Sequence, residues 1–126
     1  MLKQQDAQDA KKKTVVAYDK LGGKHLPASI EAERAVLSAL LLDDTHIGRI
    51  AEIVAPEDFY HIPHKLVFQA IISLAVQSKR IDLVTLQDEL FKQNVLEQIG
   101  GVVFLVSLQE DIPMLGLLDQ HATLVK

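Results

Sequence analysis

The chain has 126 residues, of which 48% are hydrophobic and 24% are charged, and it contains no Cys. This composition fits one globular domain and excludes a disordered chain, a disulfide framework and a thiolate metal site. The net charge of −4 is uneven, because residues 1–23 carry +2 and residues 24–126 carry −6. Since DNA binding depends largely on Lys and Arg that neutralise phosphates, the acidic body is a poor candidate for a DNA-binding surface.

The sequence also lacks signals for secretion or membrane insertion. The N-terminus has no apolar segment of the kind found in secretory signal peptides, and no apolar run reaches the length of a membrane span. Together with the absence of Cys, these features favour a cytoplasmic protein that does not enter a membrane.

Residues 1–24 are predicted to be a flexible N-terminal extension, because they lack apolar periodicity and end close to Gly22-Gly23. Within this segment the run Lys11–Lys13 permits a weak contact with phosphate, although a solubilising tail is the favoured interpretation. Residues 25–126 are predicted to form the folded domain.

The first helix of the folded domain is predicted to open near Ser29, whose hydroxyl would cap it. Glu31 and Glu33 would then lie in the first turn, where the helix dipole favours negative charge. Residues 35–42 are apolar on almost every side, which indicates a central, buried helix. Asp43 is expected to help end this helix and cap the next one.

Two further helices follow in the predicted order. Residues 46–54 place apolar side chains at i, i+3, i+4 and i+7, the pattern of one helix face. A single turn over residues 56–60 is expected to bury Phe59. The third helix is predicted from Pro63, which suits the first helical position, to residue 78. Phe68 lies off its main apolar stripe, which indicates either burial on a second side or an exposed contact.

A fourth helix is predicted to run from its cap, Asp82, to a stop at Asn94. Residues 102–108 have strand propensity, but the sequence offers no convincing second strand to pair with them. We therefore predict a fifth helix over this segment, entered through Gly100 and Gly101.

A sixth helix is predicted from about residue 114 to Lys126, and its apolar stripe continues to the last residues with no stop signal. This pattern favours a domain fragment whose last helix is truncated and needs a partner helix. The candidate interface on this stripe consists of Leu117, Leu118, His121, Leu124 and Val125. The pattern as a whole predicts an all-α fold, a compact bundle of about six helices.

Motifs for catalysis are absent from the sequence. It contains neither the P-loop pattern nor the Gly-x-Ser-x-Gly motif of hydrolases. Asp58, His61 and His64 lie within seven residues and form the candidate metal-ligating group. The favoured interpretation places them in a turn and a helix start, because Pro63 separates the two His. We therefore expect no catalytic residue, cofactor site or metal site in this chain.

Four blocks of the sequence resemble, in order, the N-terminal domain of bacterial replicative DNA helicases of the DnaB family. These blocks are Leu26–Asp43, Pro56–Tyr60 with His64 and Phe68, Ile81–Leu86, and Gly100-Gly101 with Leu105. The resemblance covers about residues 25–126, essentially the whole folded part. The residues that match the family motifs, to which we assign structural roles, are Pro27, Glu31, Glu33, Asp58, Phe59, His64, Phe68, Asp82, Gly100 and Gly101.

The resemblance implies a role in DNA replication. In this family the N-terminal helical domain precedes a linker helix and a RecA-like ATPase domain, and six chains form a ring that unwinds DNA with ATP and Mg²⁺. The N-terminal domains form a collar, often a trimer of dimers paired through a helical hairpin, and the collar receives primase. A helicase loader is a further candidate partner. The resemblance places the full protein in the cytoplasm, at the replication fork in the nucleoid.

The chain ends at Lys126, about where the first hairpin helix of the family would still be extending. We therefore expect ATP, Mg²⁺ and most DNA contacts to belong to an absent C-terminal part, while this fragment serves ring assembly and partner binding. Two alternatives stay open. One is a stand-alone helical adaptor, such as a primase's helicase-binding domain, and the other is a small metal-dependent enzyme that uses Asp58, His61 and His64.

Overall fold

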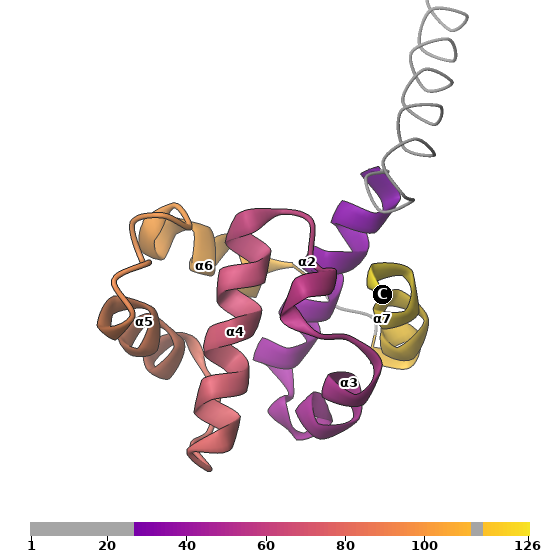
Figure 1. Cartoon of the computed structure of the whole chain (residues 1–126), viewed down its shortest axis with the longest axis horizontal. Helices are drawn as coiled ribbons and strands as arrows, with labels where there is room; N and C mark the ends of the chain where they lie inside the picture. Colours follow the sequence, from indigo (N-terminus) through magenta and orange to yellow (C-terminus); the bar gives the residue numbers. More distant parts are fainter. Residues whose placement is uncertain (1–26, 112–114) are drawn as a thin grey trace, which may run out of the picture.

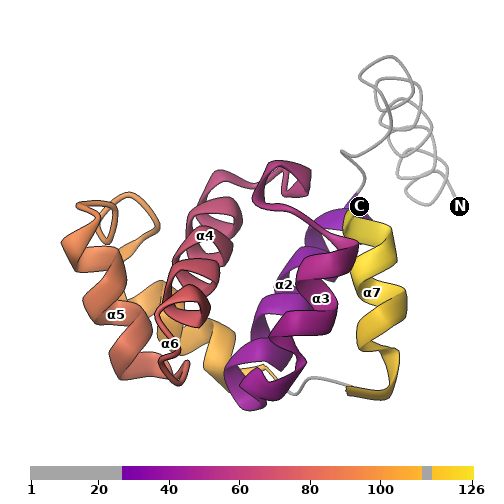
Figure 2. The ribbon, with the colours of Figure 1, turned by 60° about the horizontal axis from the view of Figure 1, so that its bottom comes forward.

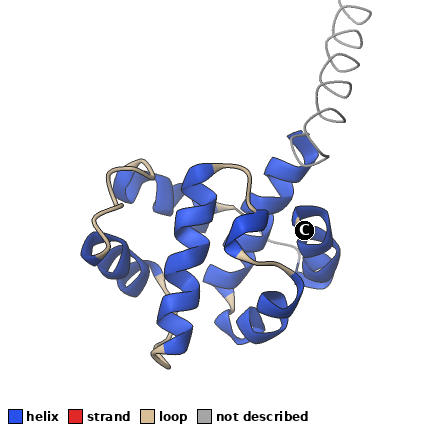
Figure 3. Ribbon diagram, viewed as in Figure 1, coloured by secondary structure: helices blue, strands red, loops and turns tan. Residues whose placement is uncertain are grey.

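The computed structural model describes residues 27–111 and 115–126 of the chain. The N-terminal extension expected over residues 1–24 lies outside these described residues. The described part is helical and contains no strand (Figure 3), so the all-α fold class is confirmed. Its elements are α2 (Pro27–Leu42), η1 (Asp44–His46), α3 (Ile47–Ile53), η2 (Pro56–Asp58), α4 (Ile62–Val76), α5 (Leu83–Lys92), α6 (Gly101–Glu110), η3 (Leu115–Leu117) and α7 (Leu118–Val125).

The helices pack around α2, which contacts α4, α6 and α7. In both ribbon views α5 and α7 lie at opposite ends of the molecule, with α4 and α2 between them (Figures 1 and 2). The core is mostly aliphatic, and its largest side chains are those of Phe59 and Phe68. Phe68 lies off the main apolar stripe of α4, and the sequence left open whether it is buried or exposed. It is completely buried, so α4 packs on a second side as well.

Several element boundaries follow from local side-chain chemistry that the sequence predicts. Asp43 and Asp82 each accept a backbone N–H at the start of the following helical element, at 3.1 and 2.8 Å. Pro63 lies in the first turn of α4, where its missing N–H leaves no intrahelical bond unmade. After α5 the backbone of Asn94 adopts the left-handed conformation, with φ 62°, which ends the helix. The predictions for Asp43, Asp82 and Asn94 are confirmed, whereas Pro63 is the second residue of α4, which begins at Ile62, and not the first.

The beginning of α2 differs from the prediction. The helix starts at Pro27, so Ser29 lies inside its first turn and does not cap it. Glu31 and Glu33 lie beyond that turn, and the helix dipole therefore does not explain them. Glu31 is exposed, whereas Glu33 is buried in the core.

Residues 102–108 form part of helix α6, which confirms the choice of helix over strand. The chain enters α6 through Gly100 and Gly101, whose φ angles of 104° and 73° lie in the region that L side chains rarely adopt. A Cβ atom at Gly100 would also lie 3.3 Å from the Cβ of Phe104. The glycine pair therefore permits the tight entry into the helix.

The last predicted helix is shorter than expected, because a single turn, η3, precedes the eight residues of α7. No single helix among the described residues is long and apolar enough to cross a membrane. The segments 101–110 and 115–125 reach the required length and composition only as a pair that is bent by 95°.

Candidate functional site

The start of α4 is held by a buried carboxylate from α2. One oxygen of Glu33 accepts the backbone N–H of Tyr60 at 2.6 Å, and the other accepts that of His61 at 3.2 Å. The second oxygen also lies 2.9 Å from Nδ1 of His64, on the first turn of α4. Glu33 and His64 expose only 1% and 3% of their surface. Because a buried carboxylate needs several donors to offset its lost hydration, this arrangement satisfies Glu33.

Glu33 takes the place of a local cap. The first N–H groups of a helix lack intrahelical partners, and His61, the residue before α4, makes no side-chain cap of its own. A carboxylate at this position also interacts favourably with the positive end of the helix dipole. Since a carboxylate accepts hydrogen bonds only, Nδ1 of His64 carries the proton in this contact. The site therefore joins α2 to α4 through polar groups inside an apolar core.

A signal for this role was present in the sequence but was not used. Glu33 shares one helix face with Val36, Leu37 and Leu40, which are fully buried. An acidic residue on such an apolar face needs a buried partner. This spacing could have placed Glu33 in the core beside buried hydrogen-bond donors, which the assignment to the first helical turn missed.

Aromatic rings surround the pair formed by Glu33 and His64. The ring of His64 lies 4.6 Å from that of His61 in an edge-on arrangement and 5.8 Å from that of Phe104. Partial burial, and next the neighbouring His64, lower the pKa of His61, although Glu33 acts in the opposite direction.

The candidate metal group does not come together as three ligands. His61 and His64 are neighbours, but His64 is engaged with Glu33, and Asp58 turns back to accept the backbone N–H of Ala55 at 2.8 Å. Over residues 27–111 and 115–126 there is no group of three side chains suited to hold a metal ion. The geometry thus supports structural roles for Asp58 and His64.

Further polar contacts, which the sequence analysis missed, fasten the ends of the helices. Arg34 on α2 reaches Asp111 at 2.6 Å and the carbonyl oxygen of Ser107 at 2.7 Å, just beyond and within α6. Asp44 accepts two bonds from the Arg80 guanidinium, at 2.8 and 2.9 Å. These bonds from Arg80, and next the backbone N–H of Ile81, lower the pKa of Asp44. These contacts fix the end of α6 and the loop before α5.

The candidate interface on the last helix is only partly exposed. Leu118 and Val125 are buried within the domain, because α7 packs closely on α2 through the small residue Ala122. The expectation that the whole stripe lacks a partner helix is therefore wrong for Leu118 and Val125. Leu117 and His121 are partly exposed, and Leu124 is 54% exposed. Of the five residues, Leu124 presents the largest apolar surface, and its role in an interface stays a prediction.

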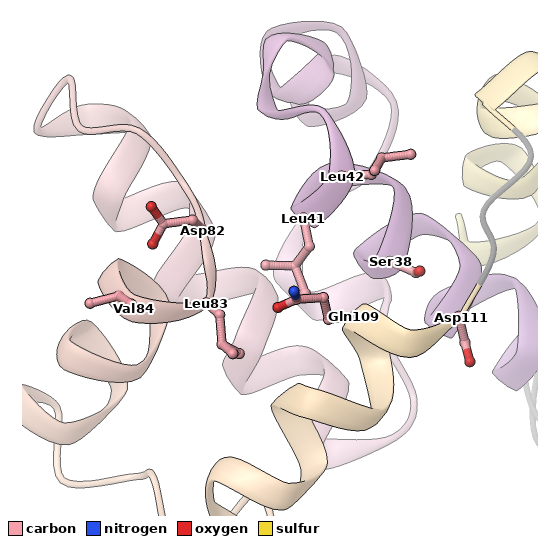
Figure 4. Close-up of a pocket in the computed structure, with 8 residues that line it drawn as sticks. All are labelled: Ser38, Leu41, Leu42, Asp82, Leu83, Val84, Gln109 and Asp111. Atoms are coloured by element: carbon pink, nitrogen blue, oxygen red, sulfur yellow. The ribbon is translucent and has the colours of Figure 1, made fainter.

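A hollow of about 290 Å³ opens at the other end of the molecule, between α2, α5 and α6. The side chains of Leu41, Leu83 and Gln109 lie around it, and Asp82 stands at its edge (Figure 4). Asp82 thus lines the edge of this hollow in addition to capping α5. Sequence periodicity did not predict this hollow, because it is made from three separate segments.

Comparisons with known proteins identify the family. The sequence model of the DnaB-like helicase N terminal domain matches residues 25–126. The chain is 40% identical over 100 residues to the replicative DNA helicase DnaB of Geobacillus stearothermophilus, covering 79% of this chain and 22% of that protein. It is 32% identical over 108 residues to the replicative DNA helicase DnaC of Bacillus subtilis, covering 86% of this chain and 24% of that protein.

A solved structure agrees with these relatives. The crystal structure of the N-terminal domain of DnaB helicase from Mycobacterium tuberculosis is similar with a TM-score of 0.70 and 33% identity, over 75% of this chain and 68% of that one. The chain spans about a quarter of the length of the curated relatives named above. The matched part is the N-terminal domain and does not include an ATPase domain. The chain belongs to the DnaB-like helicase N-terminal domain family.

Proposed function

We propose that this chain acts as the N-terminal collar domain of a ring-forming replicative DNA helicase. The observation that carries the proposal is the match of residues 25–126 to the family's N-terminal domain, joined to relatives whose name is replicative DNA helicase. The chain contains no phosphate-binding motif of its own. ATP hydrolysis, Mg²⁺ binding and most contacts with DNA therefore belong to another part of such a helicase, which acts at the replication fork.

Assembly and partner binding are the tasks of the domain in this proposal. Six copies form the collar of a hexamer as a trimer of dimers, and the collar receives primase and, as a further candidate, a helicase loader. The acidic charge of residues 24–126 supports contacts with proteins over contacts with DNA. Leu124, exposed beside the buried residues of α7, is the side chain of the predicted stripe best placed to touch another copy.

A chimera tests the proposal. Residues 25–126 replace the corresponding segment of the Geobacillus stearothermophilus helicase, and the purified chimera is examined by analytical ultracentrifugation and by a DNA-stimulated ATPase assay. We expect hexamers with ATPase activity close to that of the parent. A folded chimera that stays monomeric contradicts the assembly role. A matched chimera with Leu124→Asp measures how much Leu124 contributes to assembly.

A further inference from the structure

Two hollows adjoin along the outer face of α5, and together they are called the track here. The hollow between α2, α5 and α6 shares Val84 with a second hollow of about 310 Å³, which is lined by Val84, Gln87, Asp88, Phe91 and Leu96. The α5 positions of this second hollow are spaced i, i+3, i+4 and i+7, so they form one face of the helix. The two hollows therefore adjoin at Val84.

Large apolar side chains stand exposed on this track. Val84 is 72% exposed and Phe91 is 69% exposed, and Leu42, beside the first hollow, is 63% exposed. Val84 and Phe91 lie two helical turns apart, about 10 Å along the axis. Exposed apolar side chains that cluster beside hollows and are bordered by polar groups are typical of a surface that a partner covers.

The segment that contains α5 and α6 is acidic. Residues 81–111 contain six acidic residues and one basic residue, Lys92. Asp82 and Asp88 lie on the track itself and are exposed. Asp88 pairs with Lys92 at 2.9 Å, but both side chains are more than half exposed, so this ion pair is weak. A cationic side chain of a partner can therefore take the place of Lys92 beside Asp88. Along α5, the exposed apolar side chains of Val84 and Phe91 therefore alternate with the exposed acidic side chains of Asp82 and Asp88.

We infer that this track, defined by Leu42, Val84 and Phe91, binds a basic amphipathic helix of a partner protein. Such a helix presents apolar side chains at i, i+3 or i+4 and i+7, which match the two-turn separation of Val84 and Phe91. Its Lys and Arg side chains face Asp82 and Asp88. The inference rests on the partner-binding part of the proposed function and adds the surface and the chemistry of the partner.

Charge excludes two other occupants of the track. Pairing the same face of two copies would place Asp82 and Asp88 of one copy against the same acidic side chains of the other, which opposes association. Nucleic acid is repelled for the same reason, because its phosphates need basic side chains. A basic amphipathic helix is the occupant that satisfies both the exposed apolar side chains and the acidic side chains beside them.

A synthetic peptide tests the inference directly. The probe is a 14-residue, fluorescein-labelled helix of Ala, Leu and Lys, with its Leu residues on one face and its Lys residues beside them. Its binding to the 126-residue chain is measured by fluorescence anisotropy, and its site is mapped by amide chemical shifts. We expect shifts confined to α5 and to the adjoining end of α2. A peptide of the same composition with its Leu residues spread around the helix should bind at least tenfold more weakly.

Matched variants separate the track from the rest of the surface. The pair Val84→Ser and Phe91→Ser should weaken binding of the probe at least tenfold, whereas Ile62→Ser and Val76→Ser, which change exposed apolar residues elsewhere, should leave it unchanged. Equal binding of the two peptides, equal losses in the two pairs of variants, or shifts centred on α7 would each overturn the inference. Peptide binding is measured on the 126-residue chain and does not require a hexamer. A failure of the chimera to assemble therefore leaves the outcome of the peptide assay unaffected.

Discussion

Replacing Glu33 by Ala tests the account of how α2 and α4 are joined. The change removes the acceptor for the backbone N–H groups of Tyr60 and His61 and for Nδ1 of His64. Leaving one buried donor without a partner costs about 1–3 kcal/mol. Three donors would lose their acceptor, and relaxation lets water reach some of them, so we expect a loss of about 3–5 kcal/mol in the free energy of unfolding.

Urea unfolding followed by circular dichroism at 222 nm measures this loss. The matched control is Glu31→Ala, which changes an exposed Glu two residues earlier on the same helix and should alter the free energy by less than about 0.5 kcal/mol. Glu33→Gln retains one acceptor oxygen and should fall between the two. A loss below about 1 kcal/mol for Glu33→Ala, or equal losses for the two Ala variants, would refute the role of Glu33 as the cap of α4.

Three further predictions concern the last helix, the loop before α5 and the entry into α6. Leu118→Ala should lower the free energy of unfolding by about 2–5 kcal/mol in urea, because Leu118 is buried. Leu124→Ala should lower it by less than about 0.5 kcal/mol, because Leu124 is exposed. Equal losses for the two variants would contradict the packing of α7 on α2. The pKa of Asp44 is lower in the folded chain than in the unfolded chain, so its contribution is present above pH about 4 and is lost as the pH falls below that value. The thermal midpoint of the natural chain should thus fall more steeply below pH about 4 than that of Asp44→Asn, and parallel curves would count against the contact with Arg80. Gly100→Ala should lower the free energy of unfolding in urea by about 1–3 kcal/mol, because φ is 104° at this position. Gly48→Ala in α3 should raise it slightly, because a Cβ there meets nothing within 4 Å. An unchanged free energy for Gly100→Ala would show that the backbone at Gly100 is not restrained.

The sequence predicts most of the helices because their signals are local. Caps such as Asp82, Pro63 at the start of α4 and the periodic apolar residues of α4 and α5 each depend on neighbours within a few positions. Gly100 and Gly101 before α6 likewise indicate a backbone with positive φ, because Gly adopts such φ angles at no steric cost. Local signals of this kind do not depend on how the helices pack against each other.

Contacts between distant segments explain what the sequence analysis missed. Glu33 was assigned to a helix start because its true donors lie 27 to 31 positions away. Leu118 and Val125 looked unpartnered because their partner, α2, lies near the other end of the sequence. The hollow beside Leu41 and Leu83 arises only when α2, α5 and α6 come together. Each of these features depends on tertiary packing, which periodicity does not contain.

The mass and activity of the native protein that carries this sequence test the central claim most directly. An antibody raised against residues 25–126 recovers that protein from a cell extract, and its mass, assembly and ATPase activity are measured. We predict a polypeptide several times larger than 14.0 kDa, in ring-sized assemblies with DNA-stimulated ATPase activity. A native chain close to 14.0 kDa, recovered without any ATPase activity, would contradict the collar assignment and favour a stand-alone helical adaptor.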